Sequence, residues 1–170
     1  PRSESGLAKT RETYKFPDKG PVMVSKLQQR INPCPLLKAL KQGHPYGYPN
    51  VLVGKPSESF AGVQKFIDPN QLGNSVKILS DVPSRDLPHL YRLAEASIFS
   101  SLYEGFGIPV LESLACGTPV LTSEQSCMQE IANDAGLYFN PKETDSINEA
   151  ILTFDKTGIT DKIEAAITER

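Results

Sequence analysis

The sequence predicts a doubly wound α/β fold, in which helices cover both faces of a parallel sheet of about six strands. Two observations carry this prediction. Short apolar runs alternate along the chain with longer stretches whose apolar residues recur at helical spacing. The 170 residues are also enough to bury a core without disulfides or metals. Right-handed crossovers between parallel strands then place the helices on both faces.

The first half of the chain predicts a linker followed by three strands and two helices. Residues 1–20 are polar and end in a Pro-Asp-Lys-Gly sequence, which indicates an interdomain linker with one or two helical turns around residues 7–14. Apolar runs predict strands at residues 21–24, 51–53 and 76–79. Leucines at residues 36, 37 and 40 predict a helix over 35–41, and apolar residues 60, 63 and 67 predict one over 57–67.

The second half continues the same alternation. Apolar runs predict strands at residues 96–99, 119–122 and 136–139. Amphipathic or apolar segments predict helices at residues 86–94, 109–116, 124–132, 144–154 and 161–168. We therefore divide the chain into a linker (1–20), one α/β domain (21–156) and a C-terminal helical segment (157–170). Ligands of such folds bind outside the carboxyl ends of the strands.

Charge and hydropathy exclude several classes of protein. Lysine plus arginine is 18 and aspartate plus glutamate is 20, so the net charge is −2. We therefore expect no nucleic-acid partner, because phosphate binding needs clustered basic residues. No apolar run approaches the roughly 18 residues of a membrane span, and no secretory signal begins the chain. The first residue is Pro1 rather than Met, so we expect that the chain was cut or trimmed.

The cysteines and histidines form no recognisable metal or catalytic set. Cys34, Cys116 and Cys127 are odd in number and no pair has the C-x-x-C spacing, so we expect no zinc and no disulfide. Such thiols are typical of a reducing compartment, and we expect a cytoplasmic location. Cys116 is expected to be a small buried hydrophobe. His89 is expected to be a surface or packing residue, since no nucleophile lies near it.

The most informative segment is the loop between the fourth strand and the next helix. It carries Gly105 and Gly107, and Pro109 fits the first helical turn, where a missing N–H costs nothing. Bare glycine backbones and the unpaired N–H groups of a helix N-terminus suit an anion. A diphosphate is the natural ligand of this arrangement. A Gly-x-Gly before a helix also occurs in many α/β loops without a ligand.

Two carboxylates flank this loop. Glu104 lies within it, and Glu112 lies in a helix that is otherwise nearly apolar. An unpaired carboxylate is costly to bury, so a donor must face Glu112. Sugar or ribose hydroxyls are one such donor. A backbone N–H or a lysine is the structural alternative.

The stretch from Glu104 to Val120 closely resembles the signature of retaining, nucleotide-sugar-dependent glycosyltransferases of the GT-B fold, glycosyltransferase group 1 type. Residues 86–94 resemble the helix before that signature, and residues 130–137 the segment after it. Residues 11–17 resemble the linker that enters the C-terminal, donor-binding domain. The resemblance covers residues from about Thr10 to Phe154. It implies that residues 21–156 form a Rossmann-like, nucleotide-sugar-binding lobe.

The resemblance also implies a role for each residue of the signature. Glu104 would contact hydroxyls of the donor sugar, and Glu112 the ribose hydroxyls. Backbone N–H groups would face the diphosphate and the sugar, from Gly105, Phe106, Gly107 and Ile108. Val82 would contact the base through its main chain. The family transfers a sugar with retained configuration and without an essential metal, so we expect no cofactor besides the nucleotide-sugar substrate.

The chain departs from the family where cations usually hold the diphosphate. The family has Gly-Arg after the first strand and a Lys a few residues later; here Ser25-Lys26 and Ile31 stand at those positions. Lys26 keeps the charge without the bidentate fork of arginine. Arg30 lies one residue before Ile31 and is expected to replace the missing cation. We therefore expect Lys26 and Arg30 to act in catalysis with Glu104, and Ser25 to contact the donor.

Three functions remain to be compared. The first is the donor-binding half of a glycosyltransferase, inactive alone because its acceptor-binding domain is missing. The second is a degenerate module that holds a nucleotide or glycan without turnover, which Ile31 favours. The third, a receiver-like regulatory domain, needs an acidic cluster after the early strands, where Ser25-Lys26 and Gly54-Lys55 stand instead. The expected partners are a nucleotide sugar and the acceptor domain, through which the whole protein would touch a membrane peripherally.

Overall fold

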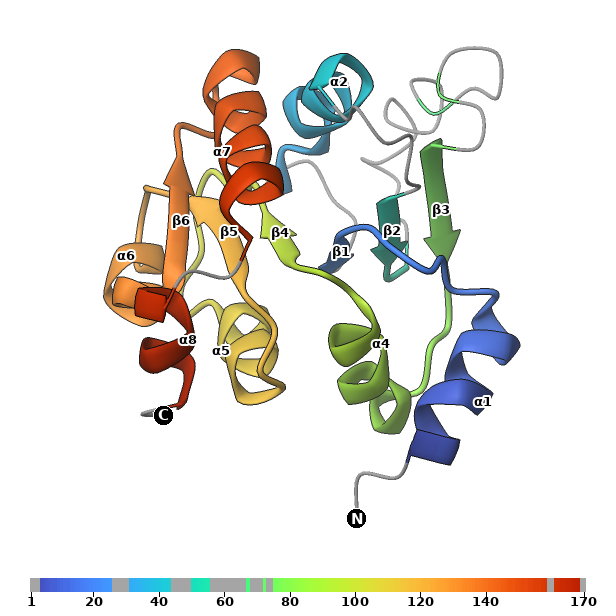
Figure 1. The fold of residues 1–170 in the computed structure, drawn as a ribbon. Helices are drawn as coiled ribbons and strands as arrows, with labels where there is room; N and C mark the ends of the chain where they lie inside the picture. The colour runs from blue at the N-terminus through green and yellow to red at the C-terminus, as the bar shows by residue number, and fades with distance from the viewer. Residues whose placement is uncertain are drawn as a thin grey trace.

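The computed structural model describes residues 4–25, 31–43, 50–55, 67, 72, 75–158 and 161–168. These residues form one parallel sheet of six strands in the order β3-β2-β1-β4-β5-β6 (Figure 1). The strands are β1 (Val22–Val24), β2 (Asn50–Val53), β3 (Val76–Leu79), β4 (Ser97–Phe99), β5 (Val120–Ser123) and β6 (Gly136–Phe139). Each lies on a predicted apolar run, so the doubly wound α/β prediction is confirmed.

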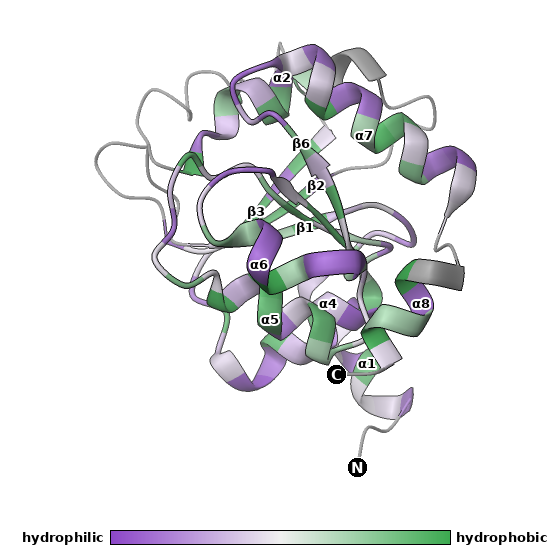
Figure 2. Ribbon diagram, turned by 90° about the vertical axis from the view of Figure 1, so that its left-hand side faces the viewer, coloured by the Kyte–Doolittle hydropathy of each residue, from purple (hydrophilic) through white to green (hydrophobic). Residues whose placement is uncertain are grey.

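Helices cover both faces of the sheet (Figures 1 and 2). On one face lie α2 (Pro33–Gly43) and α7 (Thr144–Thr157), which pack against each other. The other face is covered by α1 (Glu4–Tyr14), α4 (Leu87–Leu93), α5 (Ile108–Ala115), α6 (Met128–Ala132) and α8 (Asp161–Thr168). The 3₁₀ turns η4 (Ser84–Asp86) and η5 (Asn133–Ala135) precede α4 and β6.

Alternation of side chains along each strand builds two separate cores. Successive strand residues point to opposite faces, so every second residue joins the same core. The core under α2 and α7 takes Met23, Leu52, Ile98 and Leu121. The core under α4, α5 and α6 takes Val22, Val51, Phe99 and Val120. The central strands therefore read as continuous apolar runs, as strands buried on both faces do.

Two helices differ from the prediction. The N-terminal segment forms an 11-residue helix rather than one or two turns, because Thr10 is buried and Tyr14 packs on the core beneath α4. The predicted helix 124–132 begins only at Met128. Ser126 has a φ of 61°, a left-handed conformation that a right-handed helix cannot contain. The residues before Met128 are therefore a turn, and that turn lies beside the candidate site.

The expectations for histidine and cysteine have different outcomes. His89 is a packing residue, since its Nδ1 lies 3.2 Å from the hydroxyl of Thr10 on α1. Cys116 is half-buried and packs against the core beneath α5, so the prediction of a buried hydrophobe is confirmed only in part; it follows the last residue of α5. No disulfide joins the three cysteines.

The predicted helix 57–67 lies outside the described residues, except for Ile67.

Strand order locates the position where a ligand is expected. The chain adds β2 and β3 on one side of β1, and then β4, β5 and β6 on the other side. In such sheets a crevice opens outside the carboxyl ends of the two central strands, here β1 and β4. The loops that follow β1 and β4 begin at Ser25 and Ser100. Among the described helices, none is both long and apolar enough to cross a lipid bilayer.

Candidate functional site

A hollow of about 400 Å³ opens at the carboxyl edge of the sheet. Its walls come from the ends of β1 and β2, the loop after β3 and the starts of α4 and α5. They are Val24, Ser25, Val53, Gly54, Lys55, Asp81, Val82, Leu87 and Pro109. Ser25 and Val82, both predicted as donor contacts, thus line one hollow. Its apolar walls and its place beside the helix start suit a flat ring linked to an anion.

An ion pair lies at this hollow. Lys55 Nζ is 2.6 Å from Asp81 Oδ1, and both side chains are largely exposed. The hydrogen bond to Asp81 raises the pKa of Lys55, and the charge of Asp81 raises it further. A surface pair of this kind adds little stability. Its position between the loops after β2 and β3 instead gives the hollow both a positive and a negative group.

The start of α5 is shaped by Gly107. This residue caps the helix with φ 66° and ψ 38°, in the left-handed region where a side chain is strained. A Cβ there would also meet Ile131 Cδ1 at 3.0 Å and Met128 Sδ at 3.3 Å. Gly105 differs, since no atom lies within 4 Å of the place a Cβ would occupy. The loop therefore packs at Gly107 and leaves open space beside Gly105, where a ligand can approach the backbone.

The turn after β5 holds the same loop in place. Ser126 Oγ donates to the carbonyl oxygen of Glu104 at 2.6 Å, and Cys127 Sγ approaches that oxygen at 3.4 Å. The backbone N–H of Glu104 donates to Ser126 Oγ at 3.4 Å. Ser101 Oγ donates to the carboxylate of Glu104 at 3.2 Å and so orients it. None of these three partners was predicted from the sequence. Ser126 and Cys127 lie 22 and 23 positions from Glu104, and nothing local marks such distant residues as partners.

The large side chains of the loop face outward. Tyr103 is 69% exposed, Phe106 63% and Ile108 58%. Phe106 and Ile108 are therefore free of the core, as expected of residues whose backbone rather than side chain meets a ligand. These apolar groups lie around the start of α5, at the carboxyl edge of the sheet.

Glu112 has a specific partner. It lies on α5 and is half-buried, and its Oε2 accepts a hydrogen bond from the hydroxyl of Tyr91 on α4 at 3.1 Å. Burial raises the pKa of Tyr91 far above its ordinary value of 10.0, and the Glu112 charge raises it further. Tyr91 therefore keeps its proton and acts as a donor. Among the described residues, the partner of this carboxylate is neither of the structural alternatives, a backbone N–H or a lysine.

The predicted cations have no described position. Lys26 and Arg30 lie outside the described residues. Ile31 is described and is only 1% exposed, packed in the core with Met23 and Leu36. An isoleucine side chain gains free energy by leaving water, so residue 31 offers no side-chain group to a diphosphate. Its carbonyl oxygen accepts a hydrogen bond from Ser100 Oγ at 2.8 Å, which ties residue 31 to the end of β4.

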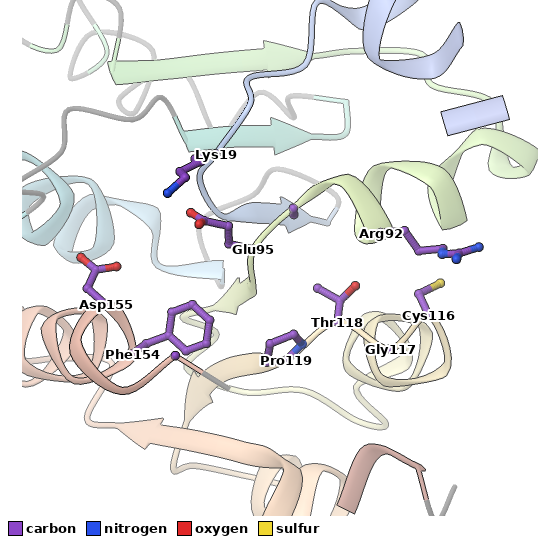
Figure 3. A pocket seen from close by; sticks show the side chains of 11 residues that line it. Lys19, Arg92, Glu95, Cys116, Gly117, Thr118, Pro119, Phe154 and Asp155 are labelled. Atoms are coloured by element: carbon purple, nitrogen blue, oxygen red, sulfur yellow. The ribbon is translucent and has the colours of Figure 1, made fainter. Parts of the chain in front are cut away.

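A larger hollow, of about 720 Å³, lies at the opposite edge of the sheet (Figure 3). Figure 3 shows Lys19, Glu95 and Asp155 on one side of it and Arg92 apart from them. The residues that directly follow α4, α5 and α7 also line it, namely the C-caps Ala94, Cys116 and Gly158. Helix C-termini present carbonyl oxygens, which repel a phosphate. None of the predicted site residues that the structure describes lines this hollow, so the carboxyl edge remains the candidate site.

Comparison with known sequences places the chain in a family. The sequence model of the family described as Glycosyl transferases group 1 matches residues 9–165. The O-antigen chain mannosyltransferase B of Escherichia coli is 43% identical over 77 residues, which are 45% of this chain and 20% of that protein. The O-antigen chain mannosyltransferase RfbU of Salmonella typhimurium is 30% identical over 109 residues, which are 64% of this chain and 31% of that protein. The chain thus spans under a third of either relative.

Solved structures show the same fold. A glycosyltransferase from Rickettsia africae superposes with a TM-score of 0.85 at 20% identity, over 98% of this chain and 46% of that one. Anabaena HepE in complex with UDP gives 0.82 at 24% identity, over 98% and 46%. The C-terminal domain of the group 1 glycosyl transferase LpcC from Francisella tularensis gives 0.79 at 17%, over 99% and 93%. The chain has the fold of the C-terminal half of a GT-B glycosyltransferase and belongs to the glycosyl transferases group 1 family.

Proposed function

We propose that this chain is the donor-binding lobe of a retaining glycosyltransferase, which transfers a sugar from a nucleotide-diphosphate sugar to an acceptor held by a second lobe. One observation carries the proposal. The loop that carries Glu104, Gly105 and Gly107 and the hollow lined by Ser25 and Val82 lie at the carboxyl edge of the sheet, and Glu112 lies on the helix α5 that this loop opens. That edge includes the crevice where such sheets bind nucleotides.

Each part of the donor has a matching group. The base fits the apolar hollow beside Val82, and the ribose hydroxyls donate to Glu112. The diphosphate accepts hydrogen bonds from the N–H groups at the start of α5, where the helix dipole favours an anion. The sugar hydroxyls meet Glu104, whose carboxylate Ser101 orients.

The departing diphosphate must be stabilised as the sugar leaves. We assign this task to the N–H groups of Gly105 to Ile108 and to Lys26 and Arg30, with no metal required. Preorganised donors aimed at the developing charge are commonly the largest contribution to such catalysis. The loop that carries the amides is held by Ser126, so little reorganisation is needed when the charge develops.

The transferred group is proposed to be a hexose. Two of the relatives are named mannosyltransferases, and HepE has been solved with UDP-glucose. The base hollow offers main-chain groups, apolar side chains and the ion pair of Lys55 and Asp81, a set of groups that does not select one base. The base and the sugar are to be identified by measuring which members of a panel of UDP-, GDP- and ADP-sugars bind the chain.

The acceptor site is proposed to lie on a separate lobe, because the relatives are several times longer than the part that this chain matches. The chain alone is then expected to bind a nucleotide sugar and to transfer little or none of it. Detectable transfer by this chain to a broad panel of acceptors would contradict the assignment of the acceptor site.

The proposal is tested by thermal denaturation with the nucleotide-sugar panel. A ligand at 100 times its dissociation constant stabilises the fold by about 2.7 kcal/mol. One nucleotide class should raise the melting temperature, and Glu112→Ala should remove most of that rise. Glu149→Ala is the matched control, since Glu149 is exposed on α7, across the sheet from the site. A panel in which no nucleotide shifts the melting temperature overturns the proposal.

A binding module without turnover is the second candidate, and the buried position of Ile31 favours it. The two candidates differ once an acceptor lobe is supplied. Mixing the chain with the separately produced acceptor lobe of the Escherichia coli relative should restore sugar transfer if the chain is an enzyme lobe. Nucleotide binding and lobe association without any transfer would favour the binding module.

A further inference from the structure

We propose that Tyr91 is a positioning residue for the donor, which fixes the carboxylate of Glu112 so that it meets the ribose hydroxyls in one orientation. This inference rests on the proposed function, because it takes Glu112 as the ribose contact. The two residues come from different helices, Tyr91 from α4 and Glu112 from α5, and their side chains meet in a hydrogen bond of 3.1 Å. The tyrosine itself need not touch the donor.

The hydroxyl of Tyr91 is a permanent donor. The residue is 1% exposed, and burial together with the neighbouring carboxylate disfavours its ionised form. One oxygen of Glu112, Oε2, is thereby occupied. Among the described contacts, Glu112 Oε1 has no hydrogen-bond partner within the chain, and the residue is only half-buried. Glu112 can thus accept from a ligand while Tyr91 holds its other oxygen.

Tyr91 is itself held at both ends. Its carbonyl oxygen accepts a hydrogen bond from Thr118 Oγ1 at 2.8 Å, which ties α4 to the turn after α5. Its ring packs in the core together with Leu90, Val110 and Leu114. Because packing fixes the Tyr91 side chain, its hydrogen bond restricts the orientation of the Glu112 carboxylate. A carboxylate that is already restricted loses less conformational freedom when the ribose binds.

The alternative is that the Tyr91 hydroxyl serves stability alone. Phenylalanine would fill the same space without a buried hydroxyl. Because a buried hydroxyl is costly unless it is hydrogen-bonded, its bond to Glu112 is expected under both the stability role and the positioning role. The chain offers a matched control for this alternative. The hydroxyl of Tyr14 donates to Asp86 Oδ2 at 2.6 Å, which is also a tyrosine–carboxylate hydrogen bond at α4, but it involves neither Glu112 nor α5.

The experiment measures the affinity of the chain for a nucleoside diphosphate and for its 2′,3′-dideoxy form. UDP and GDP are both used, and the ratio of the two affinities isolates the contribution of the ribose hydroxyls. Tyr91→Phe should weaken ribonucleotide binding about tenfold, in line with a hydrogen bond to a charged group. Dideoxynucleotide binding should change less than about twofold. Tyr14→Phe should lower the melting temperature and leave the ratio unchanged.

The outcomes separate this inference from the function on which it rests. If Tyr91→Phe leaves the ratio of ribonucleotide to dideoxynucleotide affinity unchanged, whether or not both affinities fall, the positioning role is overturned. Glu112→Gln should reduce the ratio toward one whatever Tyr91 does. If Glu112→Gln leaves the ratio unchanged, the ribose contact itself is wrong and both assignments fail. If Glu112→Gln reduces the ratio and Tyr91→Phe does not, only the role of Tyr91 fails.

Discussion

The hydroxyl of Ser126 donates to the carbonyl oxygen of Glu104 across 2.6 Å and joins the turn after β5 to the loop after β4. The left-handed backbone of Ser126, with φ at 61°, aims this hydroxyl at the loop. Because Glu104 begins the segment proposed to bind the sugar and diphosphate, the order of that segment depends on this contact.

Ser126→Ala is therefore expected to weaken nucleotide-sugar binding about five- to tenfold, with a stability loss of about 1 kcal/mol for the missing hydrogen bond. Calorimetric titration and chemical denaturation measure the two effects. Ser126→Gly distinguishes the effect of the lost hydroxyl from the effect of backbone strain, since glycine adopts the left-handed conformation without strain. It should bind as weakly as the alanine variant while being the more stable of the two. Unchanged affinity in both variants would show that the loop needs no such support.

Gly107→Ala is expected to destabilise the chain by about 2–4 kcal/mol, the sum of left-handed strain and overpacking. The overpacking arises because a Cβ would lie 3.0 Å from Ile131 Cδ1. Gly117→Ala is the matched control, with a φ of 78° but no atom within 4 Å of its added Cβ. Its cost should be about 1–2 kcal/mol. Equal losses in urea denaturation would show that the contact with Ile131 is unimportant.

The strands and the signature residues of the site were predictable because their causes are local. An apolar run predicts a buried strand wherever it lies, and Gly107 is needed by its own backbone conformation. Ser126 and Tyr91 were not predictable in this way. Their partners lie 22 and 21 residues away and meet them only after the sheet has formed. The late start of α6 has the same origin, since the turn at Ser126 serves the loop rather than the helix.

Ile31 shows the limit of reasoning from a matched position. The resemblance aligned it with a cation, but the side chain is 1% exposed in the core under α2 and α7. Ile31→Lys is therefore expected to cost more than about 3 kcal/mol, because it buries an unpaired charge. Ile31→Val should cost about 1 kcal/mol. Denaturation of both variants is the measurement, and a lysine variant that is as stable as wild type and binds nucleotide more tightly would contradict the buried position.

Donor binding is expected to need no metal ion. The proposed site places backbone N–H groups and cationic side chains on the diphosphate, and these supply the compensating charge. Affinity for the nucleotide sugar that the panel selects should therefore agree within about twofold in EDTA and in magnesium chloride. Titration of wild type under both conditions measures this. A loss of tenfold or more in EDTA would mean that a cation bridges the chain and the diphosphate.

The buried hydroxyl of Tyr91 makes stability depend on alkaline pH. Its pKa lies above its ordinary value of 10.0 in the folded chain, mainly because of burial, so the folded state keeps a proton that the unfolded state releases above pH 10.0. The stability from this residue is complete below that pH and declines above it, by about 1.4 kcal/mol per pH unit for a single group. Tyr91→Phe should show a shallower fall in the free energy of unfolding between about pH 10 and 11. Equal slopes in the two proteins would mean that Tyr91 ionises as readily folded as unfolded, which would contradict its burial beside the Glu112 carboxylate.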